Sequence, residues 1–301
     1  MHRKMLLSMI ATAVFAASPA LGQELTGTLK KIKDTGAITL GHRESSVPFS
    51  YYDDKQQVVG YAMDLCARIV DGVKNSLKLA TLETKLNPVT SATRIPLIAN
   101  GTVDLECGST TNNLERQKQV SFTITHFVTA NRFVSKKAAN LKTVDDLKGK
   151  TIVSTSGTTN IKQITEIGAQ KGLNLNILAA KDHAEAFLMV ETGRAAAFVM
   201  DDILLYSLVA GSKSPQDYVI SADALLVEPY GIMLHRDDAP FKKVVDEAMI
   251  ATYRSGAINA IYDKWFLKPI PPKGLNLNVP MSDAFKKVIA NPTDSGDPAV
   301  Y

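Results

Sequence analysis

The stretch Asp104-Leu-Glu-Cys-Gly-Ser-Thr-Thr-Asn-Asn-Leu-Glu-Arg116 says most about how this chain folds and what it holds. The apolar run from Val103 to Cys107 predicts a short strand that ends at Gly108. Three hydroxyl side chains follow directly, at residues 109–111. No general base stands beside them in the sequence, so nothing indicates that they act as nucleophiles. The pattern favours a group that holds a ligand.

The same stretch continues into a predicted helix. Asn112 is a residue type that commonly caps helices, and Arg116 would then lie one turn into the helix. Backbone N–H groups, hydroxyls and a guanidinium therefore meet at a strand-to-helix turn. That combination predicts a receptor for an anion with carboxylate geometry.

Apolar strand-like runs alternate with helical patterns along most of the chain, which indicates an α/β fold. A first series has strands expected at residues 37–41, 82–88 and 103–107, and a second has them at residues 151–155, 174–180 and 195–200. The chain then returns to helices near its end. This order predicts two lobes joined by two crossing strands. Ligands of such sheets bind at the carboxyl ends of the strands, so we expect the site in the cleft between the lobes.

The N-terminus has the pattern of a secretory signal. Met-His-Arg-Lys precedes an apolar run from Met5 to Ala17, and small residues stand at Ala20 and Gly22. The alternative of a membrane anchor is disfavoured because the run is too short to span a bilayer. We therefore predict a signal peptide over residues 1–22 and a periplasmic location for the remainder.

Composition excludes several classes of function. The formal net charge is only +4, which is too mild and too evenly spread to indicate nucleic-acid binding. The five histidines show no metal-site spacing, and Ser156 lacks the Gly-x-Ser-x-Gly elbow of hydrolases. We predict no metal, no cofactor and no enzymatic activity. Cys66 and Cys107 either pair, as cysteines of an exported chain can, or remain buried thiols, and the sequence leaves both alternatives open.

Several segments, in this order, resemble the periplasmic amino-acid-binding proteins of ABC importers, and most closely those that bind glutamate and aspartate. The segments are Gly41-His-Arg-Glu-Ser-Ser-Val-Pro-Phe-Ser-Tyr51, Gly60-Tyr61, Thr90-Ser-Ala-Thr-Arg94, Glu106-Cys-Gly-Ser-Thr-Thr-Asn-Asn-Leu-Glu-Arg116, Thr155-Ser-Gly-Thr-Thr159, Ala180-Lys-Asp-His183 and Met200-Asp-Asp-Ile203. The resemblance implies a two-lobe periplasmic-binding-protein fold of type II that closes around one amino acid. It places lobe 1 at residues 23–127, lobe 2 at 128–223 and the return to lobe 1 at 224–301.

The resemblance also implies a role for each residue of the site. Arg116, Thr111 and Thr159 would hold the α-carboxylate of the ligand. Ser109 and Asp201 would hold the α-ammonium. The distal carboxylate, that of the ligand side chain, would be held by Arg43, Ser91, Arg94 and His183. Ser156 and Thr158 are further expected contacts.

The charges of these residues lead to the same ligand class. One arginine and one aspartate neutralise a zwitterion, so the other two arginines require a further negative charge on the ligand. We expect His183 to add to this positive charge. L-glutamate and L-aspartate both satisfy the requirement, and the sequence does not separate them. The expected partner is the membrane permease of an ABC importer, and the expected state is a monomer.

Some assignments remain open at this point. Tyr230 is expected either to line the cleft or to stabilise the hinge, and Phe49 either to pack in the core or to contact the ligand. Asp202 is expected to cap the next helix, and the polar segment 291–301 to fray. Two other functions stay open on this fold: an exported dehydratase-like enzyme and a chemosensory amino-acid receptor.

Overall fold

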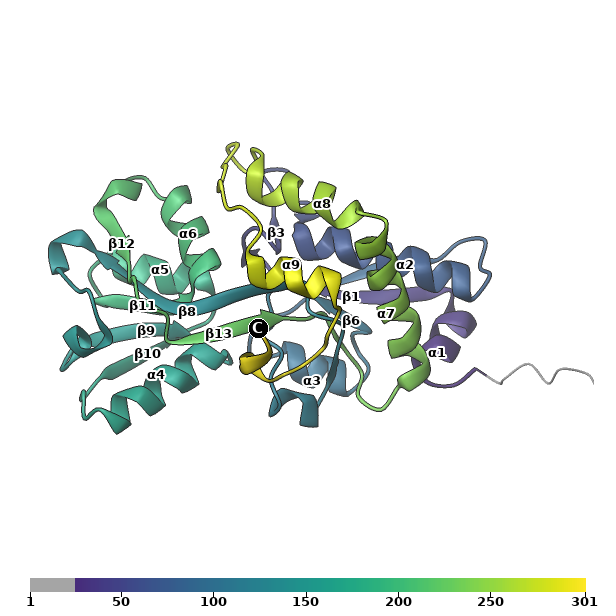
Figure 1. Cartoon of the computed structure of the whole chain (residues 1–301), viewed down its shortest axis with the longest axis horizontal. Coiled ribbons are helices and arrows are strands. Elements are labelled where there is room, and N and C mark those ends of the chain that lie inside the picture. The colour runs from purple at the N-terminus through teal and green to yellow at the C-terminus, as the bar shows by residue number, and fades with distance from the viewer. Residues whose placement is uncertain (1–24) are drawn as a thin grey trace, which may run out of the picture.

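The computed structural model describes residues 25–301, which form two α/β lobes (Figure 1). The sheet of the first lobe contains β1 (Ala37–His42), β5 (Glu83–Pro88), β6 (Leu105–Cys107), β7 (Ser121–Phe122) and β14 (Met233–Leu234). Their order across the sheet is β5-β1-β6-β14-β7. β1 is parallel to both of its neighbours, so the carboxyl ends of β1 and β6 meet at one edge of the sheet.

Helices cover the sheet of this first lobe. They are α1 (Gly27–Thr35), α2 (Tyr61–Ser76), α3 (Arg94–Ala99), α7 (Ala239–Arg254), α8 (Ala257–Tyr262) and α9 (Asp283–Ala290). The apolar face of α2 includes Cys66, Ile69 and Val73, all fully buried, as its helical spacing predicts. A small sheet of β2 (Ser45–Ser46), β3 (Ser50–Tyr52) and β4 (Val58–Val59) follows β1.

The second lobe, on the left of Figure 1, is built in the same way. Its strands are β8 (Phe127–Lys136), β9 (Thr151–Thr155), β10 (Asn176–Ala180), β11 (Ala197–Asp201) and β12 (Tyr218–Ile220), in the order β10-β9-β11-β8-β12, and β13 (Leu226–Tyr230) also pairs with β8. Its helices are α4 (Thr159–Gln170), α5 (His183–Glu191) and α6 (Asp202–Gly211). Each helix begins directly after a strand or a short turn, so the helix N-termini gather at one edge of the sheet.

Two antiparallel strands, β8 and β13, run between the lobes (Figure 1). They carry the chain out of the first lobe and back into it. These are the two crossing strands that the alternation of elements predicts.

A disulfide joins α2 to β6 through Cys66 and Cys107, with an S–S distance of 2.03 Å. The sequence had left this pairing open. The bond closes a sequence separation of 41 residues, and a loop of that length corresponds to about 4 kcal/mol of chain entropy in the unfolded state. The disulfide fixes β6 against α2. Residues 109–111, which we call the hydroxyl loop, follow β6 directly.

The expectation that the C-terminal segment frays is wrong. The backbone N–H of Thr125 donates to the carbonyl of Thr293 at 2.8 Å, and the hydroxyl groups of Tyr301 and Thr125 share a hydrogen bond of 2.7 Å. The amide of Asn112 donates to the carbonyl of Asp294 at 2.8 Å. The C-terminal tail is therefore hydrogen-bonded to the first lobe, next to the hydroxyl loop.

The predicted signal peptide lies outside the described residues. Within residues 25–301, none of the helices combines the length and apolarity needed to cross a membrane.

Candidate functional site

The hydroxyl loop after β6 is buried, and Arg94 donates hydrogen bonds to it. Arg94, the first residue of α3, donates from Nη1 to the Thr110 hydroxyl at 2.5 Å and to the Ser109 carbonyl at 3.3 Å. The Ser109 hydroxyl has no partner among the described residues. The loop thus presents a free hydroxyl at the end of a strand, as expected.

Arg116 is buried, but it does not follow a helix cap at Asn112. The side-chain amide of Asn112 donates to the carbonyl of Asp294 in the C-terminal tail. The side chain of Asn113 instead accepts from the Arg116 N–H at 2.8 Å. Arg116 begins a short 3₁₀ turn at Arg116–Lys118, where an α-helix was expected. Its guanidinium donates to the Thr111 carbonyl at 2.9 Å and to the Gly157 carbonyl of the second lobe at 3.1 Å.

Arg43 and Arg94 form a second cationic group. Arg43 follows β1 and donates from Nη2 to the Ser91 hydroxyl at 2.7 Å. Arg43 Nη1 and Arg94 Nε have no partner within residues 25–301. Burial lowers the pKa of Arg43 to about 10, helped by the charge of Arg94, and burial lowers that of Arg116 to about 9. Burial lowers the pKa of Arg94 as well, but a guanidinium group keeps its proton in proteins, so all three groups remain charged at neutral pH.

His183 is a neutral donor and does not add the positive charge that we expected. Its Nδ1 shares a hydrogen bond of 2.8 Å with the Thr155 hydroxyl, whereas its Nε2 has no partner in the described chain. Burial, and then the charges of Arg43 and Arg94, hold the pKa of His183 well below its ordinary value. A neutral imidazole can still donate one hydrogen bond.

Asp201 is the charged group that the second lobe contributes. It is buried at the end of β11, and its carboxylate accepts from Asn160 Nδ2 at 2.7 Å and from the Tyr230 hydroxyl. Burial, and then the charge of Glu228, raise the pKa of Asp201. Tyr230 belongs to the crossing strand β13, so it orients Asp201 from the hinge.

Asp202 does not cap α6 as expected. Its carboxylate accepts from the Thr129 hydroxyl at 2.6 Å and from Arg132 Nε at 3.1 Å, both on β8. Asp182 does cap α5, by accepting from the Glu185 N–H at 2.9 Å.

These side chains surround a small pocket between the lobes. Most of the predicted site residues line it: Ser91, Arg94, Ser109, Thr111, Thr158, Thr159, His183 and Asp201. Arg43 and Arg116 do not line it, but they donate hydrogen bonds to the lining residues Ser91 and Thr111. Ser156 does not line it, and the hydroxyl of Thr158 accepts from the Ile161 N–H as the cap of α4.

The lobes touch over this pocket. Besides the Arg116 contact, the hydroxyls of Thr111 and Thr159 lie 3.5 Å apart, and Lys162 pairs with Glu115 at the surface. Gly157, at φ +77°, packs directly on the backbone of Ala92 in the first lobe. The structure is therefore a closed state.

Three buried polar residues were missed by the sequence reasoning. Asn160 lines the pocket, Glu228 accepts from Thr159 Oγ1 at 3.0 Å, and Glu106 accepts from the Thr110 hydroxyl at 2.6 Å. A charged residue inside an otherwise apolar strand was the available signal for both glutamates. Phe49 belongs to the aromatic core, where it contacts Tyr61 and Tyr230, and it does not line the pocket.

The arrangement is suited to binding. The Arg94 guanidinium and the Asp201 carboxylate line the pocket, and the guanidinium groups of Arg43 and Arg116 bond to lining residues. Four buried polar atoms of this group have no partner in the described chain: Arg43 Nη1, Arg94 Nε, Ser109 Oγ and His183 Nε2. Buried polar atoms are normally satisfied, so these atoms mark where a polar ligand belongs. Residues 25–301 contain no cluster of three metal-ligating side chains.

Known proteins resemble this chain closely. It is 55% identical to the L-glutamate/L-aspartate-binding protein of Pseudomonas aeruginosa, over 95% of this chain and 96% of that protein. It is 47% identical to the glutamate/aspartate import solute-binding protein of Escherichia coli K12, over 92% and 91% of the two chains. These relatives are binding proteins and not enzymes.

Solved structures agree on the fold. An arginine-binding protein mutant from T. maritima superposes with a TM-score of 0.70 at 26% identity, covering 79% of this chain and 98% of that one. An ancestral arginine-binding protein bound to arginine gives 0.69 at 25% identity, over 77% and 98%. Residues 38–268 match the family model described as bacterial extracellular solute-binding proteins, family 3. The chain belongs to this family.

Proposed function

We propose that this protein is the periplasmic receptor that captures L-glutamate or L-aspartate by closure of its two lobes and delivers it to the membrane permease of an ABC importer. The observation that carries the proposal is the charge at the pocket. The Arg94 guanidinium of one lobe and the Asp201 carboxylate of the other line it, and the buried guanidinium groups of Arg43 and Arg116 bond to its lining residues Ser91 and Thr111. A relative that is 47% identical is named for glutamate and aspartate import, which supports the same ligands.

Each ligand group has a matching set of partners. Arg116, with the hydroxyls of Thr111 and Thr159, holds the α-carboxylate between the lobes. Asp201 and the free Ser109 hydroxyl hold the α-ammonium. A desolvated charge is tolerated only where it is paired and hydrogen-bonded, and these partners meet that condition.

The distal carboxylate of the ligand lies against Arg43, Ser91, Arg94 and His183. The unpartnered Arg43 Nη1, Arg94 Nε and His183 Nε2 are three donors for its two oxygens. A neutral amide in this place leaves two guanidinium charges unmatched, which disfavours glutamine and asparagine.

Closure is the mechanical step. The ligand bridges first-lobe cations and second-lobe Asp201, while β8 and β13 act as the hinge. We place the lobe boundaries at residues 127/128 and 223/224, near the two crossing strands, and we take the receptor to act as a monomer exported by the segment 1–22.

Titration calorimetry with four amino acids tests this function. L-glutamate and L-aspartate should bind at least about a hundredfold more tightly than L-glutamine and L-asparagine, the scale of leaving a buried charge unpaired. Mass spectrometry of small molecules released from the purified protein supplies an independent identification. Equal affinities for glutamate and glutamine would refute the assignment of Arg43 and Arg94.

Affinity should also rise with pH. Burial and Glu228 raise the pKa of Asp201, so this carboxylate binds a proton more readily than usual before the ligand arrives. The ligand ammonium favours the ionised carboxylate, so binding releases that proton, and glutamate affinity increases by up to tenfold per pH unit between about pH 5 and the raised pKa. The ligand carboxyl groups ionise below this range.

Calorimetry in buffers of different ionisation enthalpy counts the released protons. Glu228→Gln removes the neighbouring charge, so in this variant the rise should move to lower pH. A flat affinity from about pH 5 to 8 without proton release would contradict the pairing of Asp201 with the ammonium.

A further inference from the structure

Glu106 is a fully buried carboxylate on β6 that forms no ion pair within residues 25–301. Its Oε2 accepts a hydrogen bond of 2.6 Å from Thr110, and its Oε1 has no partner there. A buried charge is costly unless something compensates it. Glu106 does not line the ligand pocket, so contact with the ligand does not explain why this carboxylate is buried.

The bonds around Thr110 have only one possible direction. Arg94 cannot accept a hydrogen bond, so its Nη1 donates to the Thr110 hydroxyl at 2.5 Å. The single hydroxyl proton of Thr110 is then donated to Glu106. Arg94, Thr110 and Glu106 form a relay that ends on a negative charge, and this relay fixes the direction of the Arg94 guanidinium.

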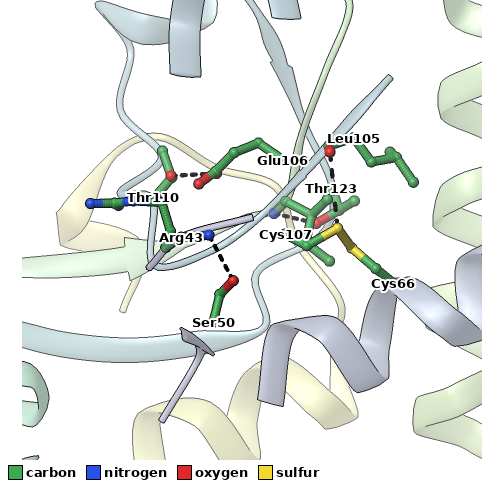
Figure 2. The surroundings of a disulfide bond; sticks show 9 residues. Arg43, Ser50, Cys66, Leu105, Glu106, Cys107, Thr110 and Thr123 are labelled. Atoms are coloured by element: carbon green, nitrogen blue, oxygen red, sulfur yellow. Dashed lines mark hydrogen bonds between the residues drawn. A yellow bond between two sulfur atoms is a disulfide. The ribbon is translucent and has the colours of Figure 1, made fainter. Parts of the chain in front are cut away.

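Glu106 also lies beside Arg43. A Cβ atom at Gly108 would stand 2.3 Å from Glu106 Oε1 and 3.0 Å from Arg43 Cγ, so both side chains pack against this glycine. Figure 2 shows Arg43, Thr110 and Glu106 together at the end of β6, next to the Cys66–Cys107 disulfide. The charge of Glu106 raises the pKa of both Arg43 and Arg94 against the effect of burial.

Arg43, Arg94 and Glu106 set the net charge of the distal subsite, which is the part of the pocket that holds the distal carboxylate of the ligand. Two guanidinium groups and one carboxylate leave one positive charge, because His183 is neutral. One positive charge matches a single ligand carboxylate. Without Glu106 the subsite would carry two positive charges and would attract an anion more strongly.

We propose that Glu106 is a specificity-determining residue of the distal subsite: it positions Arg94 through Thr110 and limits the subsite to one net positive charge. It thereby selects amino acids with one distal negative charge and restrains the affinity of a receptor that must release its ligand. The inference rests on the proposed function, since it concerns the same subsite.

The test is Glu106→Gln with three ligands whose distal groups carry no charge, one and two negative charges: L-glutamine, L-glutamate and L-2-amino-4-phosphonobutanoate at about pH 8. The introduced amide can still accept from Thr110 through its oxygen, so mainly the charge changes. Calorimetry should show an unchanged Kd for glutamine, a Kd about tenfold lower for glutamate and about a hundredfold lower for the phosphonate. A merely structural change would shift all three ligands alike.

Two further variants complete the experiment. Glu83→Gln removes the same charge from an exposed position of β5, and it should give no graded change. Thr110→Val keeps Glu106 but breaks the relay, and it should weaken glutamate about tenfold while sparing glutamine. It also tests the relay if Glu106→Gln does not fold.

Two results would overturn the role of Glu106. One is an equal shift of all three ligands in Glu106→Gln, and the other is unchanged glutamate binding in Thr110→Val. A wild-type protein that fails to prefer glutamate over glutamine would instead refute the proposed function, so the two failures are distinguishable.

Discussion

Replacing Arg116 with alanine is expected to abolish binding of every amino acid, acidic or neutral. All amino acids share the α-carboxylate, and the Arg116 guanidinium is the cation that joins Thr111 of the first lobe to Gly157 of the second. Removing one partner of a buried charge pair costs roughly 2–5 kcal/mol. The loss of the contact between the lobes adds to this cost.

Arg94→Ala should behave differently. It should weaken glutamate and aspartate by roughly 2–5 kcal/mol and leave weak binding of glutamine little changed, because its ligand partner is the distal group. Calorimetry with glutamate and glutamine on both variants measures the difference, and exposed Arg254→Ala serves as the control for loss of one arginine. If both variants lose both ligands to the same extent, the division into α-carboxylate and distal subsites is wrong.

Gly157→Ala should reduce glutamate affinity at least about a hundredfold, which is roughly 3 kcal/mol. A Cβ atom at this position would lie 2.6 Å from Ala92 Cα and 2.7 Å from Ala92 N and Ser91 O. These are backbone atoms, so they cannot turn away as a side chain could. The lobes would stop short of the closed state, and Thr159 would not reach the ligand held by the first lobe.

The matched control is Gly149→Ala. Gly149 has a similar backbone angle, φ +70° against +77°, but nothing lies within 4 Å of its Cβ position. Both alanine variants share a backbone strain of about 1–2 kcal/mol, visible in thermal unfolding, whereas only Gly157→Ala should lose affinity. Equal glutamate binding by the two variants would show that close packing at Gly157 is not needed.

Local patterns were sufficient to predict much of the fold. Hydrophobic periodicity identified β1 and α2, and the order of strands and helices indicated two lobes with crossing connections. The site residues came from the hydroxyl loop and from the family resemblance. These features depend on residues that are near one another in the chain, which is where sequence patterns carry information.

What the sequence did not reveal depends on distant contacts. Asn112 looked like a helix cap, but the C-terminal tail, far away in the sequence, occupies its side chain. His183 looked like a third cation, yet burial beside Arg43 and Arg94 makes it neutral. The roles of Glu106 and Glu228 depend on arginines that are distant in the sequence and that the fold brings near them.

Small-angle X-ray scattering of the ligand-free protein, with and without saturating L-glutamate, tests most directly whether the ligand closes the two lobes. Closure around the ligand predicts a smaller radius of gyration with glutamate, no change with glutamine at the same concentration, and no compaction in Gly157→Ala. Calorimetry on the same samples establishes that glutamate is bound. Bound glutamate with an unchanged radius of gyration in the wild-type protein would confine the site to one lobe and contradict closure around the ligand.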